Sequence, residues 1–114
     1  MFRFFSKRED EGESDTSGIP LKQGDIVLST KGRDRGTIYV VVDILPPRYC
    51  LVSDGRKRAV AEPKKKSHRH LQLVGQIDSH TLSDWGTKDS LINRGIRKAL
   101  EDFVRTETEE GGLQ

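Results

Sequence analysis

The residues best suited to chemistry in this sequence are the cations of a short segment with two glycines, Lys31-Gly-Arg-Asp-Arg-Gly36. The segment lies between two apolar runs, so we expect a tight connection between two strands. Glycines there can adopt positive φ or let another group approach the backbone closely. Lysine and arginine on such a loop suit contacts to phosphate oxygens, which fix a protein on a nucleic-acid backbone. The segment therefore predicts a contact with a polyanion.

Two further basic clusters follow in the same half of the chain. A-form RNA is recognised largely through phosphates, sugar hydroxyls and shape, so short cationic loops on a rigid scaffold suit that target. The sequence alone leaves open whether the three clusters converge on one surface. The candidate RNA-binding residues are Lys31, Arg33, Arg35 and Gly36 in the first cluster, Arg56, Lys57 and Arg58 in the second, and Lys64, Lys65, Lys66, His68, Arg69 and His70 in the third.

Positive charge is concentrated in the middle of the chain. Residues 22–75 carry 12 Lys and Arg against 5 Asp and Glu, whereas residues 1–21 carry 3 against 5 and residues 76–114 carry 5 against 8. A basic domain between mildly acidic ends favours a polyanionic partner through counterion release. For charge alone, a solvated basic surface without a partner is the alternative.

The other reactive side chains form no catalytic or metal-binding pattern that we recognise. Three histidines, His68, His70 and His80, and the single Cys50 lack the spacing of a zinc site. The serines lack a matched base, and the glycines do not precede a helix as in a phosphate-binding loop. We therefore expect no enzyme and no cofactor or small-molecule substrate. The lone cysteine is expected to be a buried apolar residue in a reducing compartment.

Two tyrosines, Tyr39 and Tyr49, are the only aromatic residues between residues 22 and 75. Both alternate with core residues, so we predict that both pack in the core. Unpaired bases are commonly held by exposed aromatic side chains. Without such a platform, sequence-specific binding of single strands is not expected.

Five short predicted strands must position the basic clusters. The clearest, Thr37–Leu45, is apolar on both faces, which fits a central strand, and two prolines end it. The strands are expected at residues 25–30, 37–45, 48–53, 56–62 and 71–74, with a two-residue hairpin turn at Asp54-Gly55. The fold class predicted is mainly β, a small SH3-like five-stranded barrel with a C-terminal amphipathic helix.

The ends of the chain differ in character from this domain. We expect a disordered acidic tail over residues 1–20, the barrel over 21–75, a linker over 76–88, the helix over 89–105 and a disordered tail over 106–114. The helix has one apolar stripe, which needs either the barrel or another molecule as its partner. The apolar N-terminus, Met1–Phe5, is too short for a secretory signal and no run is long enough to span a membrane, so we expect a cytoplasmic protein.

The residues Gly24-Asp-Ile-Val-Leu-Ser-Thr-Lys-Gly-Arg-Asp-Arg-Gly-Thr-Ile-Tyr-Val-Val-Val-Asp-Ile44 resemble a KOW motif, a strand-loop-strand unit of ribosomal proteins and transcription elongation factors. The continuations Tyr49-Cys-Leu-Val-Ser-Asp-Gly and Lys66-Ser-His-Arg-His-Leu resemble the KOW-type large-subunit ribosomal protein fourteen group of archaea and eukaryotes, and short bacterial KOW proteins of that group. The resemblance covers about residues 22–75. The acidic N-terminal segment and the lack of a long basic C-terminal extension are departures from that group.

The resemblance implies an SH3-like barrel that binds structured RNA, most often ribosomal RNA, with Gly36 matching the characteristic glycine of the family. We therefore expect a ribosome-associated or accessory ribosomal protein, whose C-terminal helix is available to neighbouring ribosomal proteins. Two alternatives stay open: an SH3-like protein-interaction adaptor, and a transcription-associated KOW factor.

Overall fold

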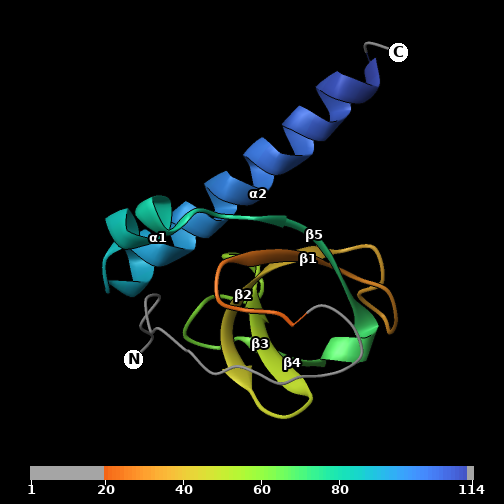
Figure 1. Ribbon diagram of the computed structural model, residues 1–114. Coiled ribbons are helices and arrows are strands. Elements are labelled where there is room, and N and C mark those ends of the chain that lie inside the picture. Colours follow the sequence, from red (N-terminus) through yellow and green to blue (C-terminus); the bar gives the residue numbers. More distant parts are fainter. Residues whose placement is uncertain (1–19, 113–114) are drawn as a thin grey trace.

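The structure, a computed structural model, describes residues 20–112, which form an antiparallel sheet and two helices (Figure 1). The predicted N-terminal tail therefore lies, except for Pro20, outside the described residues. The elements are β1 (Asp25–Ser29), β2 (Ile38–Leu45), β3 (Tyr49–Ser53), β4 (Lys64–Ser67), the 3₁₀ turn η1 (His68–His70), β5 (Leu71–Gln76), α1 (Ser79–Trp85) and α2 (Asp89–Gly112).

The five strands form one sheet in the order β4-β3-β2-β1-β5, with antiparallel neighbours throughout. The sheet is not closed by hydrogen bonds, because β4 and β5 each pair on one side only. The turn η1 joins these two edge strands directly. The predicted five strands are thus confirmed in number, whereas "mainly β" is inaccurate because two helices contribute a comparable share of the structure.

Strand β2 is buried on both faces, as its two-sided apolar pattern predicts. Val40 and Val42 belong to a cluster that the helices cover, and Tyr39 and Val41 belong to a second cluster on the other face. Among residues 20–112, no helix contributes to the second cluster. It consists of Val27, Tyr39, Val41, Cys50 and Val52 with partly buried Leu21, Ile44 and Leu71. The sheet therefore buries that face largely against itself.

The predicted fourth strand, residues 56–62, is wrong, and so is the two-residue hairpin at Asp54-Gly55. Residues 54–63 form an irregular connection, and the strand that pairs with β3 begins at Lys64. Polar contacts hold this connection in place. The Asp54 carboxylate accepts from two amides of its own loop, and the amide of Val60 donates to Asn93 Oδ1 of α2 at 2.7 Å. The helix thus supplies a hydrogen bond that a strand would have supplied.

The helices lie on one face of the sheet (Figure 1). Ile92, Ile96 and Leu100 of α2 are buried in the cluster with β1 and β2, so the predicted apolar stripe packs on the sheet of the same chain. Two features were not predicted. A short helix, α1, occupies residues that were expected to be a linker, and α2 continues to Gly112, past the expected end at residue 105.

Gly95, inside α2, lies against the side chain of Trp85, the last residue of α1. A methyl group added there would overlap the indole ring of Trp85. Replacing Gly95 with alanine should therefore lower the free energy of unfolding by about 1–3 kcal/mol, the usual cost of overpacking. Intrinsic helix propensity alone predicts the opposite sign, a gain of about 1 kcal/mol. Urea denaturation followed by circular dichroism distinguishes the two, and a more stable variant would contradict the close packing.

Candidate nucleic-acid interface

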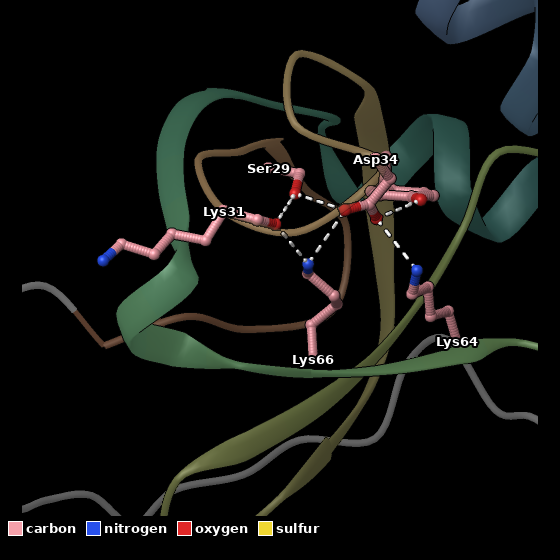
Figure 2. Close-up of polar contacts among 6 residues, drawn as sticks. Ser29, Lys31, Asp34, Lys64 and Lys66 are labelled. Carbon is pink, nitrogen blue, oxygen red and sulfur yellow. Dashed lines mark hydrogen bonds and ion pairs between the residues drawn. The ribbon is translucent and has the colours of Figure 1, made fainter.

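The carboxylate of Asp34 organises the loop that precedes β2 (Figure 2). Its Oδ2 accepts from the Tyr39 hydroxyl at 2.6 Å and lies 3.2 Å from Lys64 Nζ. Its Oδ1 lies 2.9 Å from the Ser29 hydroxyl and accepts from Lys66 Nζ at 3.1 Å. One side chain thus connects β1, β2 and β4.

This network shifts two pKa values. Burial alone would raise the pKa of Asp34, but hydrogen bonds from Tyr39, Lys66, Ser29 and Lys64 outweigh it and hold the pKa well below the usual 3.8. Burial, together with the hydrogen bond to Asp34, raises the pKa of the Tyr39 phenol well above its usual range. At neutral pH the site therefore contains an ionised carboxylate and a neutral phenol donor.

The run Lys64-Lys65-Lys66 is a strand, and its side chains alternate between two faces. Lys66 faces inward, is 8% exposed, and also donates to the Lys31 carbonyl at 3.2 Å. Lys64 is 30% exposed and ion-paired to Asp34. Lys65 points outward and is exposed. Of these three predicted RNA-binding lysines, Lys66 is consequently occupied in holding the fold, Lys64 is partly so, and Lys65 is available to a ligand.

The loop of residues 31–36 presents its cations to solvent. Gly32 and Gly36 have φ values of 96° and 95°, which favour glycine, and turn hydrogen bonds such as Arg35 N to Gly32 O at 3.1 Å close the loop. Lys31, Arg33 and Arg35 are exposed, and the Lys31 side chain points away from the Asp34 network (Figure 2). Asp34 therefore fixes the loop from inside and leaves its three cations free of that network.

The third cluster meets this loop at η1. The amide of Thr30 donates to the His70 carbonyl at 2.9 Å. From β4, the Lys66 ammonium donates to the Lys31 carbonyl. Arg69, in the middle of η1, is exposed. The first and third predicted clusters therefore converge. We call the exposed cations of this loop and of η1, which are Lys31, Arg33, Arg35 and Arg69, the basic face.

The two histidines of this cluster are only partly exposed. Burial lowers the pKa of His68 below its usual 6.5, despite an opposing hydrogen bond with the backbone of Tyr49. Its Nε2 is buried without a hydrogen-bond partner among the described residues. His68 is therefore neutral at pH 7 and contributes no charge to the basic face. His70 contributes its backbone carbonyl to the junction with Thr30.

The second cluster lies at the same end of the sheet as the loop of residues 31–36, and it also contacts α2. Ser53, just before this loop, pairs with Val40 near the start of β2. Arg56 forms an ion pair with Glu101 of α2 at 2.7 Å, although both side chains are exposed. Lys57 and Arg58 are exposed. The loop therefore extends the cationic surface through these two residues, and Arg56 is shared with the helix.

The predicted core position of Tyr49 is wrong. Tyr39 is 3% exposed, as predicted, but Tyr49 is 40% exposed and Lys65 Nζ lies 4.7 Å from the centroid of its ring. The sequence could have predicted that Tyr49 faces outward. Cys50 and Val52 alternate with Tyr49 and Leu51, and only one of these two sets can face the interior of the curled sheet. The structural role of Asp34 was also not predicted, because in the sequence it is a single acidic residue within a basic loop.

Two of the five acidic side chains within the basic domain, those of Asp25 and Asp34, point inward. Asp25 is 1% exposed and accepts from the Lys22 amide at 2.8 Å, and the Asp34 side chain is 13% exposed. Burial raises the pKa of Asp25, against hydrogen bonds from Lys22 and Gln76 that lower it. With these two carboxylates turned inward and most cations outside, the exposed charge of the domain is mainly positive.

Within residues 20–112, no group of three or more His, Cys, Asp and Glu side chains is placed to hold a metal ion. Over the same residues, no helix has both the length and the apolar character needed to cross a membrane. Cys50, predicted to be buried, is buried, and burial raises the pKa of its thiol to about 12. The sequence matches no protein-family model, and the search of curated proteins returned no match.

Proposed function

We propose that this chain is a non-catalytic, cytoplasmic RNA-binding protein that contacts the backbone of structured RNA through its basic face. The observation that carries the proposal is the convergence of Lys31, Arg33, Arg35 and Arg69 over a loop whose only acid is turned inward. Exposed cations fixed on a short, hydrogen-bonded scaffold suit phosphate contacts, which give affinity without reading sequence.

The resemblance to KOW proteins supports ribosomal RNA as the target, and a ribosome-associated or accessory ribosomal protein as the role. It also supports a finer description of the fold as a partly open SH3-like barrel. Consistent with that description, η1 links the two edge strands, one face of the sheet packs largely on itself, and the Asp34 network ties β4 to the loop between β1 and β2.

Salt dependence tests the proposal most directly. Binding to a folded RNA such as purified ribosomal RNA should weaken steeply with salt, with a slope of log affinity against log salt of roughly −0.9 for each phosphate that the protein neutralises. Neutralising four to six phosphates with the basic face and its neighbours would give a slope of about −4 to −5. Fluorescence anisotropy between about 50 and 300 mM KCl measures it, and a slope near zero would rule out the proposal.

Sedimentation of a cell lysate tests the ribosomal role separately. Co-migration with a ribosomal subunit at low salt, abolished by RNase treatment or by high salt, would support it. Recovery in light fractions with a discrete protein partner would instead favour the adaptor alternative, and charge reversal on the basic face should then leave that partner bound.

A further inference from the structure

Tyr49 stands on the outer surface of the sheet, at the start of β3. Its neighbours in the chain on β3, Cys50 and Val52, point into the buried cluster on the opposite face. The ring is 40% exposed. Strand β3 lies next to the edge strand β4, so a ligand can reach the exposed part of the ring from solvent.

One cation lies over this ring, and a second precedes it in the chain. Lys65 Nζ lies 4.7 Å from the ring centroid, and Arg48, the preceding residue, is exposed. Across the strand pair, Tyr49 faces Ser67, whose hydroxyl accepts from the amide of Arg69 in η1 at 3.2 Å. The tyrosine is therefore connected, through Ser67 and η1, to the basic face. Such a combination of an aromatic surface and flanking positive charge binds nucleobases together with their phosphates.

We propose that Tyr49 is a stacking site for an unpaired nucleobase, and that the RNA bound by this protein contains a bulged or looped-out nucleotide beside a paired segment. This inference rests on the proposed function and narrows its substrate class. The basic face would hold the phosphates of the paired segment. The exposed part of the Tyr49 ring would cover the base, with Lys65 and Arg48 next to the phosphates that flank it.

The geometry favours a nucleobase over a protein side chain. A protein ligand would require a wide apolar surface around the ring. The exposed apolar residues near Tyr49 in the chain are only Pro46 and Pro47, whereas the charged groups beside it, Arg48 and Lys65, are both cations. Stacking also requires no hydrogen-bond readout, which agrees with a site that offers a ring and cations but no fixed set of donors and acceptors.

The experiment compares two RNA hairpins that differ only by a single bulged adenosine, each at about 50 mM KCl. The protein variants are Tyr49→Ala, Tyr49→Leu, which keeps apolar bulk without a ring, and Tyr49→Phe, which keeps the ring. We expect Tyr49→Ala and Tyr49→Leu to weaken binding of the bulged hairpin by about 5- to 150-fold and that of the paired hairpin by less than about twofold. Tyr49→Phe should bind both hairpins as the unmodified protein does. With 2-aminopurine in the bulge, only proteins with a ring should quench its fluorescence.

The outcomes separate this inference from the proposed function. If both hairpins bind but Tyr49→Ala changes neither affinity, the stacking site is wrong and the RNA-binding function stands. If Tyr49→Ala weakens both hairpins equally, or if Tyr49→Leu behaves like Tyr49→Phe, Tyr49 acts through bulk or fold rather than stacking, and the inference is wrong. If the unmodified protein binds neither hairpin at low salt, the proposed function fails together with it.

Discussion

Replacing Asp34 with alanine is expected to lower the free energy of unfolding by about 3–5 kcal/mol, the usual cost of removing one partner of a buried ion pair. The variant would leave the Lys66 ammonium, 8% exposed, with only the Lys31 carbonyl as acceptor, and the Tyr39 hydroxyl without its acceptor. A loss of this size is a large fraction of the 5–15 kcal/mol that typically stabilises a domain. Urea denaturation, monitored by circular dichroism, measures it.

A second substitution at Lys66 tests the mechanism behind that loss. The double variant Asp34→Ala with Lys66→Met should be more stable than Asp34→Ala alone, because no unpaired ammonium remains buried. Lys57→Met, the same change at an exposed lysine, should alter stability by less than about 0.5 kcal/mol. If the double variant were less stable than Asp34→Ala alone, the ion pair with Lys66 would not be the main interaction of Asp34.

The pH dependence gives the Asp34 contribution a distinct signature. The folded-state pKa of Asp34 lies below the usual 3.8, so its stabilisation is complete above that value and is lost as the pH falls through the folded-state pKa. The stability gap between the unmodified protein and Asp34→Ala should therefore be constant from about pH 5 to 8 and shrink below about pH 4. A gap that widened in acid would contradict the ionised carboxylate.

The sequence predicted the strands that are made of apolar residues and failed where polar side chains determine the backbone. Strand β2 was predicted almost to the residue because both of its faces are apolar and two prolines follow it. Strand β4, by contrast, is Lys-Lys-Lys-Ser, a composition that predicts a solvated loop. It is a strand because its backbone pairs with β3 while Asp34 holds the side chains of Lys64 and Lys66, and contacts across 32 residues of sequence cannot be inferred from local pattern.

The candidate site, like the fold, was predicted only where it depends on local sequence. The loop of residues 31–36 was predicted because two glycines and three cations are local features. Its convergence with η1 depends on the hydrogen bond from Thr30 to His70, which joins residues far apart in the chain and has no signature in the sequence. The inclusion of Lys66 among the RNA-binding residues stays a prediction. Its burial and its ion pair with Asp34 could not be predicted, since a count of cations does not show which of them already have a partner.

Reversing the charge of Arg33 and Arg35 is expected to weaken RNA binding by about 100-fold or more at about 100 mM salt, since a charge-assisted hydrogen bond contributes about 1.5–3 kcal/mol. Both side chains are exposed and take no part in the Asp34 network, so Arg33→Glu with Arg35→Glu should leave the thermal midpoint nearly unchanged. The slope of log affinity against log salt should become shallower by about 2, because the variant no longer neutralises two of the phosphates.

Lys88→Glu with Arg94→Glu provides the matched control, because it changes the net charge by the same amount at two exposed residues. Lys88 and Arg94 flank the start of α2, which lies on the opposite side of the molecule from η1 (Figure 1). If only net charge governed binding, both double variants would lose affinity equally and with the same change in slope. A loss confined to Arg33 and Arg35 would place the phosphate contacts on the loop that Asp34 holds, because long-range attraction between exposed charges is screened within about 10 Å at this salt concentration.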